Sequence, residues 1–111
     1  MNVLFVCSRN RWRSLTAEEI FKKKERLSVR SAGTSPQARV KITAKLMQWA
    51  DLVFVMEKKH KQLLMSHFPH LCAGKQMIVL DIEDEYGFMD EDLIEILKTS
   101  VSPYLNEPDY H

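Results

Sequence analysis

Short apolar runs alternate with longer segments of helical pattern along this chain. Apolar runs predict strands over residues 3–6 and 52–56, and two shorter mixed segments predict strands over residues 27–31 and 76–80. The segments between and after them predict helices over residues 14–25, 39–49, 57–67 and 90–101. A short run that is apolar throughout is typical of a strand buried on both faces of a parallel sheet. Strands that alternate with helices therefore predict an α/β fold, in which helices cover both faces of the sheet.

The size and charge of the chain narrow the class of protein. With 111 residues, 45% of them hydrophobic and 28% charged, it matches a soluble globular protein with one domain over residues 1–111. The net charge of +1 argues against bulk electrostatic capture of nucleic acid or membrane. No apolar run reaches the length of a membrane span, and no signal peptide is visible. Two cysteines are too few for a secreted disulfide framework, so we expect a cytoplasmic protein.

The segment after the first apolar run predicts an anion site. Cys7 follows that run directly, five residues separate it from Arg13, and a helical segment begins at Ser14. A loop of this length can turn its backbone N–H groups inward, and the helix directs its positive end at the same point. The planar guanidinium of Arg13 matches two phosphate oxygens. Such surroundings favour the thiolate form of a cysteine, which makes Cys7 a candidate nucleophile.

This segment and three others resemble one enzyme family. The pattern Cys7-x-x-Asn10-x-x-Arg13-Ser14, followed by Ala17-Glu18, is similar to the signature of low-molecular-weight protein tyrosine phosphatases. The resemblance continues at residues 31–34 (Ser-Ala-Gly-Thr), 50–56 (Ala-Asp-Leu-Val-Phe-Val-Met) and 84–87 (Asp-Glu-Tyr-Gly). These blocks stand in the family's order, and the chain most resembles a shortened bacterial branch of it.

The resemblance implies a fold and a reaction. The fold is a flavodoxin-like sheet of four parallel strands in the order 2-1-3-4, with helices on both faces. The reaction is hydrolysis of a phosphomonoester, with phosphotyrosine as the implied substrate, through a cysteinyl-phosphate on Cys7. Arg13 binds equatorial oxygens and stabilises their charge in the transition state. We expect no metal or other cofactor, and the expected partner is a phosphorylated protein or a small phosphomonoester.

The leaving oxygen of a phosphomonoester needs a proton, and several carboxyl groups follow the fourth strand. They are Asp81, Glu83, Asp84 and Glu85. A carboxylic acid can donate that proton, and the resulting carboxylate can then activate the hydrolytic water. Asp84 matches the acid of the family, so we predict that it has this role. Asp81, which ends the strand, is the alternative.

Other residues are predicted to contact the substrate or to support the loop. Asn10 suits a left-handed backbone conformation, and the resemblance implies that it holds the shape of the loop with Ser31 as its partner. Ser14 either donates a hydrogen bond to the Cys7 sulfur or caps the helix. Tyr86 resembles the family's aromatic pocket wall, although a partly buried loop tyrosine is an alternative. The predicted substrate contacts are Arg9, Asn10, Arg11, Trp12, Ser14 and Tyr86.

The chain departs from the family pattern around the predicted site. Arg9 stands where the family usually has Gly, Trp12 replaces a second Cys that many members have, and Glu85 replaces a Pro. The segment between residues 34 and 51 is also shorter than usual. These departures concern the identity of the substrate more than the type of reaction.

The loop side chains have two possible arrangements. If Arg9, Arg11 and Trp12 point outward, the mouth of the site favours ligands with more than one anionic group, such as acidic phosphopeptides or nucleotides. In the other arrangement both arginines pair with acidic residues of the 81–92 segment, and Trp12 packs under the loop. The usual behaviour of loop arginines and large aromatic side chains favours the second arrangement.

Three other functions are compatible with parts of the pattern. A thiol-linked arsenate reductase needs additional thiols, and Cys72 is the one other cysteine of the sequence. A phosphate-binding regulatory module needs no acid near Cys7, and a phosphocarrier needs neither Arg13 nor an acid.

The pattern His67-x-x-His70-x-Cys72 offers three metal ligands where a structural zinc site usually has four, so we interpret it as a surface loop.

Overall fold

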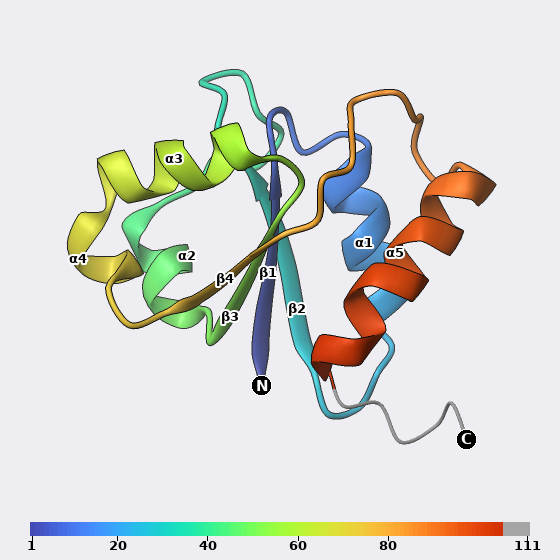
Figure 1. Cartoon of the computed structure of the whole chain (residues 1–111), viewed down its shortest axis with the longest axis horizontal. Coiled ribbons are helices and arrows are strands. Elements are labelled where there is room, and N and C mark those ends of the chain that lie inside the picture. Colours follow the sequence, from blue (N-terminus) through green and yellow to red (C-terminus); the bar gives the residue numbers. More distant parts are fainter. Residues whose placement is uncertain (106–111) are drawn as a thin grey trace.

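In the computed structural model, which describes residues 1–105, the chain folds around one four-stranded parallel sheet (Figure 1). Its strands are β1 (Asn2–Cys7), β2 (Ser28–Gly33), β3 (Leu52–Val55) and β4 (Gln76–Val79), in the order β2-β1-β3-β4. The predicted flavodoxin-like strand order is therefore confirmed. In a parallel sheet the carboxyl ends of all strands meet at one edge, where ligands usually bind. Cys7 lies at that edge, paired in register with Gly33.

Helices cover both faces of the sheet (Figure 1), as predicted. The helices α1 (Arg13–Phe21) and α5 (Glu91–Leu105) lie on one face, and α2 (Ala44–Trp49), α3 (Lys58–His67) and α4 (Pro69–Cys72) lie on the other. Because successive side chains of a strand point to opposite faces, β1 contributes Val3, Phe5 and Cys7 to the first face and Leu4 and Val6 to the second. All five side chains are buried.

Aromatic side chains form the centre of the first face. The Phe5 ring stacks between Phe21 and Phe54, with ring centroids 5.7 and 5.2 Å away. Tyr104 of α5 meets Phe54 edge-on at 5.8 Å. Burying large rings supplies much of the apolar area that stabilises a small fold. Rings on either side of Phe5 therefore hold in place the strand that ends in the candidate nucleophile.

The helix boundaries differ from the prediction in several places. The predicted helix over residues 39–49 is wrong for its first five residues, and α2 begins only at Ala44. Lys41 instead forms a bridge with Gly33, and the Thr43 side chain accepts a hydrogen bond from Leu46 N–H as the cap of α2. The run contains β-branched residues, which suit extended backbone better than helix.

The other helices differ at their ends. The helix α1 ends at Phe21 rather than at residue 25. Pro69, expected in a loop, is the first residue of the short helix α4, a position where proline needs no N–H partner. The helix α5 continues past the predicted end to Leu105. Within residues 1–105, no helix combines the length and apolar character needed to cross a membrane.

Candidate active site

The loop between β1 and α1 wraps around the Cys7 sulfur. Cys7 is almost fully buried, and its Sγ accepts a hydrogen bond from the Asn10 backbone N–H at 3.2 Å. Ser14 Oγ lies 2.9 Å from the same sulfur. Ser14 is the second residue of α1, whose N-cap is Trp12, so the alternative that Ser14 caps the helix is wrong. Two hydrogen-bond donors therefore face Cys7 Sγ and can stabilise negative charge on it.

Asn10 connects the loop to the rest of the fold. Its backbone has the left-handed conformation, with φ 57°, and its side chain is fully buried. The amide Nδ2 donates to Ser14 Oγ and to Ser31 Oγ, both at 2.8 Å. Ser31 Oγ in turn donates to the Glu18 carboxylate at 2.5 Å. The loop is thus tied to α1 and to β2 through one side chain, with Ser31 in the predicted place.

The segment after β2 supports the loop from outside. Thr34 N–H donates to the Cys7 carbonyl and Ser35 N–H to the Ser8 carbonyl, both at 2.9 Å. Gly33 makes this close approach possible, because a Cβ at that position would lie 2.4 Å from the Ser8 carbonyl oxygen. Contacts that short do not occur in folded proteins without rearrangement. The glycine is therefore needed for the backbone of the loop to pack against β2.

Arg13 is buried beneath the loop, and other protein groups already contact part of its guanidinium. Its Nη1 donates to Glu57 at 2.5 Å and to the Ile82 carbonyl at 2.7 Å. Its Nε lies 3.7 Å from an Asp84 carboxylate oxygen. A guanidinium has five N–H donors, so Nε and Nη2 remain for an anion. The acceptors on Nη1 fix the plane of the fork relative to Cys7.

Glu57 and His60, at the start of α3, form a second support. The two residues cap the helix reciprocally, and His60 Nδ1 accepts from Glu57 N–H at 3.0 Å. The imidazole proton is therefore on Nε2, which donates to Ser8 Oγ at 2.9 Å. Burial, and then the positive charge of Arg13, lower the pKa of His60 to about 4. The hydrogen bond from Arg13 lowers the pKa of Glu57, so at neutral pH it is a carboxylate beside a neutral imidazole.

A small cavity opens above the sulfur. It has a volume of about 40 Å³ and is lined by Cys7, Ser8, Arg9, Arg11, Trp12, Arg13 and Asp84. Asp84, the predicted acid, lines this cavity with half of its side chain exposed. The structure thus brings together the predicted nucleophile, arginine and acid. It also places all of the predicted loop contacts, Arg9 to Trp12, at or under the same opening.

The arrangement in which the loop side chains are covered is wrong. Arg9 and Arg11 are exposed, and within residues 1–105 neither side chain forms an ion pair with the acidic segment. Trp12 is 41% exposed rather than packed under the loop. The acidic segment makes its contact with the buried Arg13 instead, through Asp84. Asp81, Glu83 and Glu85 line a separate depression, so they form no ion pair with either arginine.

The remaining predicted residues of the acidic segment lie apart from the cavity over Cys7. Asp81, Glu83, Glu85 and Tyr86 line a separate depression with Ile82 and Ile96. Tyr86 packs against the core of the first face, so it does not wall the cavity as predicted. Asp81, the alternative acid, also does not reach it. A hydrogen bond with Glu83 and the repulsion of its charge raise the pKa of Glu85.

Cys72 lies on the other face of the sheet. It packs with the second core cluster and lines a cavity of about 500 Å³ beside α4. Cys7 belongs to the first cluster, so the sheet separates the two thiols. Burial raises the pKa of Cys72. No group of three or more metal-ligating side chains is present among residues 1–105, His67, His70 and Cys72 included.

Glu57 and His60 were not among the predicted site residues. Because Glu57 directly follows a predicted strand, the sequence places it at the carboxyl edge of the sheet with Cys7, where the structure has it, but no role in the site was predicted for it. His60 gives no comparable signal, because a histidine inside a helix is ordinary. Their roles depend on contacts with residues 44 and 52 positions away in the chain.

Comparisons with known proteins identify relatives of this chain. Residues 2–44 match the model of the low molecular weight phosphotyrosine protein phosphatase family. A protein-arginine-phosphatase of Bacillus subtilis (strain 168) is 35% identical over an alignment of 95 residues, which covers 61% of this chain and 63% of that protein. The match therefore spans less than two thirds of the relative's length.

Solved structures extend the similarity to nearly the whole chain. A YwlE mutant from Bacillus subtilis superposes with a TM-score of 0.74 at 26% identity, covering 96% of this chain and 99% of that one. The tyrosine phosphatase Wzb from Escherichia coli K30, solved in complex with phosphate, has a TM-score of 0.76 at 19% identity, covering 95% and 96%, which shows the shared fold. Taken with the loop geometry, these matches show that residues 2–44 are similar to the low molecular weight phosphotyrosine protein phosphatase family, and that the chain shares its fold with phosphatases of known structure.

Proposed function

We propose that this protein is a cysteine-dependent phosphatase with Cys7 as nucleophile, Arg13 as phosphoryl-binding residue and Asp84 as general acid. The observation that carries the proposal is that these three side chains line one cavity of about 40 Å³. Residues distant in sequence come together there with the types and positions that phosphoryl transfer needs. Similarity to a phosphatase family over residues 2–44, and to a protein-arginine-phosphatase, supports the same reaction.

The proposed reaction has two steps. The Cys7 thiolate attacks phosphorus, so that a P–S bond forms while the bond to the leaving group breaks, and Asp84 gives its proton to the leaving atom. In the second step the Asp84 carboxylate takes a proton from water, the water oxygen attacks phosphorus, and the P–S bond breaks. Inorganic phosphate and the thiolate are released, and Asp84 is protonated again. Arg13 stabilises the charge on the equatorial oxygens in both steps.

The substrate is proposed to be a phosphorylated protein in the cytoplasm. Phosphotyrosine is the first candidate, because the family description names it. Phosphoarginine is the second candidate, because the relative at 35% identity is a protein-arginine-phosphatase. The two differ in whether Asp84 protonates an oxygen or a nitrogen, and the geometry around Cys7 accommodates either reaction.

Two other functions are less well supported by the geometry. A phosphate-binding module without turnover needs no acid in the cavity, yet Asp84 lines it. Arsenate reduction through internal thiols needs a second cysteine near Cys7, and Cys72 lies on the opposite face of the sheet. Phosphatase chemistry is the function that uses all three cavity residues.

The test is a turnover panel with matched cysteine variants. We expect wild-type protein to hydrolyse p-nitrophenyl phosphate and at least one of two peptides, phosphorylated on tyrosine or on arginine. Cys7→Ser should reduce turnover to below a few per cent, because an alcohol does not ionise at neutral pH, whereas Cys72→Ser should leave it unchanged. A Cys7→Ser protein that keeps substantial activity, or wild-type protein that turns over none of the three, contradicts the proposal.

A further inference from the structure

The mouth of the cavity carries an unusual combination of side chains. Arg9, Arg11 and Trp12 line it and are exposed. Phe88 and Met89, with 50% and 39% exposure, belong to the segment that contacts the first turn of α1, where Met89 N–H donates to Thr16 Oγ1 at 2.9 Å. We call these five residues the mouth rim.

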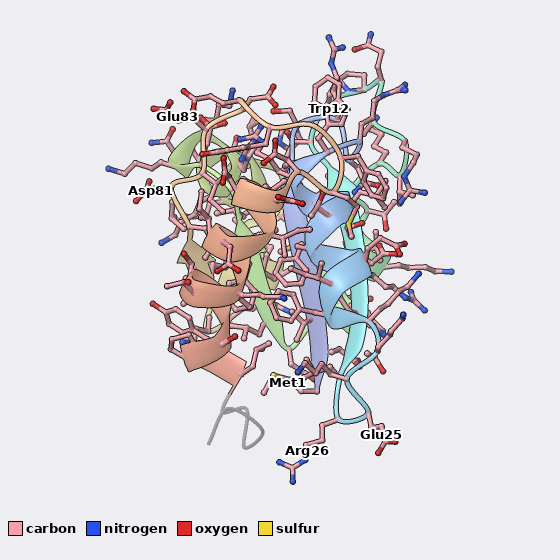
Figure 2. All side chains as sticks on the ribbon, turned by 90° about the vertical axis from the view of Figure 1, so that its right-hand side faces the viewer. Met1, Trp12, Glu25, Arg26, Asp81 and Glu83 are labelled. Atoms are coloured by element: carbon pink, nitrogen blue, oxygen red, sulfur yellow. The ribbon has the colours of Figure 1, made fainter. Side chains whose placement is uncertain are left out.

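The two rim arginines have no acidic partner in the described part of the chain. The one carboxylate on the cavity, Asp84, is 3.7 Å from the buried Arg13. Asp81 and Glu83 lie across the upper end of the molecule from Trp12 (Figure 2). Two guanidinium groups are thus held beside a phosphoryl-binding cavity with their positive charge uncompensated by neighbouring side chains.

The cavity itself is too small to select a substrate. Its volume of about 40 Å³ is far below the roughly 300–1,000 Å³ of pockets that enclose whole small-molecule ligands. A phosphoryl group fills it, so the leaving group and whatever is attached to it must lie over the rim. Selection among phosphorylated molecules therefore depends on the rim residues.

From this arrangement we propose that the mouth rim binds an acidic segment of a phosphorylated protein, with Arg9 and Arg11 contacting carboxylates that flank the phosphorylated residue. The inference rests on the proposed function and names the substrate class of the same site. Arginine, tryptophan, phenylalanine and methionine are the residue types enriched where proteins bind proteins. A polypeptide also extends to both sides of its phosphorylated residue, so it can reach the arginines and the Phe88–Met89 pair together.

A nucleotide is the competing ligand, because its base can stack on Trp12 and a second phosphate can contact the arginines. Binding of a nucleotide explains the exposure of fewer rim residues than binding of a polypeptide does. A nucleotide that contacts Arg9, Arg11 and Trp12 leaves Phe88 and Met89 exposed. Two exposed apolar side chains beside an active site are more readily explained by a partner that covers them.

The experiment compares matched substrates over a salt series. Peptides with one phosphorylated residue, flanked by three Glu, three Ser or three Lys, are assayed together with p-nitrophenyl phosphate and adenosine 3′,5′-bisphosphate. At low salt we expect kcat/KM to fall from the Glu to the Ser to the Lys peptide, by roughly 1.5- to 5-fold for each arginine–carboxylate contact. The differences should shrink as the salt rises, because exposed charges are then screened.

Variants separate the rim from general charge effects. Arg9→Ala/Arg11→Ala should remove the preference for the Glu peptide over the Ser peptide. The matched control is Lys23→Ala/Arg26→Ala, which removes two exposed positive charges just after α1 and should keep the preference. Arg26 lies at the end of the molecule opposite Trp12 (Figure 2). Phe88→Ser should lower kcat/KM for all three peptides more than for p-nitrophenyl phosphate.

The outcomes distinguish failure of this inference from failure of the proposed function. Without turnover of any substrate the phosphatase proposal fails, and binding of the same peptides to Cys7→Ser protein still tests the rim. Equal kcat/KM for the Glu and Ser peptides, or a preference that the double arginine variant keeps, overturns the inference. So does a clear preference for the bisphosphate over the Glu peptide, which assigns the rim to nucleotides. If turnover is absent, equal affinity of the Cys7→Ser protein for the Glu and Ser peptides overturns the inference.

Discussion

The loop of residues 8–12 and the acidic segment of residues 81–90 form the two sides of the candidate site, and they are built differently. The loop is tied down by buried hydrogen bonds from Asn10, Ser14 and the segment after β2. The acidic segment has no regular structure, and most of its side chains are exposed. One side of the cavity is therefore fixed by the fold, and the other is held mainly through Ile82 and the Asp84–Arg13 contact.

This difference matches two chemical demands. Binding the equatorial oxygens requires donors placed to within fractions of an ångström before the substrate arrives. Protonating a leaving group requires only that an acid reach it, and leaving groups vary. Substitutions in the loop should therefore affect both the fold and catalysis, whereas substitutions in the acidic segment should affect catalysis alone. The predictions below test that division.

The largest effect after loss of the nucleophile is expected at Arg13. Arg13→Lys keeps the charge but not the planar fork, and it leaves Glu57 and the Ile82 carbonyl without their present donors. We expect kcat/KM for p-nitrophenyl phosphate to fall roughly 100- to 1000-fold, together with a lower midpoint of urea unfolding. Retention of near wild-type activity would mean that Arg13 supports the structure without binding the phosphoryl group.

The support behind the loop should make stability depend on pH. His60 has a pKa of about 4 when folded against an ordinary 6.5, so between these values the unfolded chain takes up a proton that the folded chain does not. The free energy of unfolding is therefore highest above pH 6.5 and should fall by roughly 2 to 3 kcal/mol on going from pH 7 to pH 4.5. Glu57, whose pKa is lowered by Arg13, extends the loss to lower pH.

Urea unfolding of a His60→Gln variant isolates this contribution. The variant lacks the titrating group, so its stability should depend less on pH between 7 and 4.5 than that of the wild type. His67→Gln, which changes an exposed histidine on the same helix, is the control and should keep the full dependence. Parallel pH profiles for wild type and His60→Gln would show that His60 does not resist protonation in the folded protein.

A smaller, purely catalytic effect is expected at Asp84. Asp84→Asn should lower turnover roughly 10- to 100-fold for substrates with poor leaving groups, and less for p-nitrophenyl phosphate, which needs little protonation. Its unfolding midpoint should hardly change, because the side chain is half exposed. Asp81→Asn, outside the cavity, should do neither. If Asp81→Asn shows the dependence on the leaving group instead, the assignment of the acid is wrong.

The smallest change is expected on oxidation, which should form no disulfide between Cys7 and Cys72. Trp12 occupies the loop position where many members of the phosphatase family that the chain resembles have a second cysteine. Cys72 is on the other face of the sheet from Cys7. Mild peroxide should therefore oxidise Cys7 to sulfenic acid and then to higher oxides. Peptide mapping by mass spectrometry without reduction checks this. A Cys7–Cys72 crosslink within one monomer would show that the two faces exchange contacts far more freely than the structure indicates.

Local patterns in the sequence predicted the sheet and the loop well, and contacts across the fold less well. The four strands follow from apolar runs, and the left-handed Asn10 follows from its residue type. The helix over residues 39–49 was predicted too long, because pairing of Lys41 with Gly33 is a tertiary contact. The sequence placed Glu57 and the segment that contains Ile82 at the right edge of the sheet, but their hydrogen bonds with Arg13 were not predicted, for the same reason.

The exposure of the side chains at the mouth of the cavity depends on the path that the acidic segment takes through the fold. Local rules favoured pairing of Arg9 and Arg11 with carboxylates, yet the chain after β4 directs Asp81 and Glu83 elsewhere. Tyr86 likewise packs against the core, where burial of its ring outweighs exposure at the mouth. Neither outcome depends on neighbouring residues in the sequence, so no local pattern could have predicted it.

The hydrogen bond from Arg13 to the Ile82 carbonyl also has a consequence for synthesis of the protein. Cys7 and Arg13 are synthesised close together in time, whereas the carbonyl acceptor that orients Arg13 is synthesised 69 residues after it. A ribosome adds roughly 5 to 20 residues per second. For several seconds the nascent chain therefore carries Cys7 without the assembled site. A nascent chain that has not reached Ile82 lacks this acceptor, so the onset of enzymatic activity would report that synthesis has passed that residue.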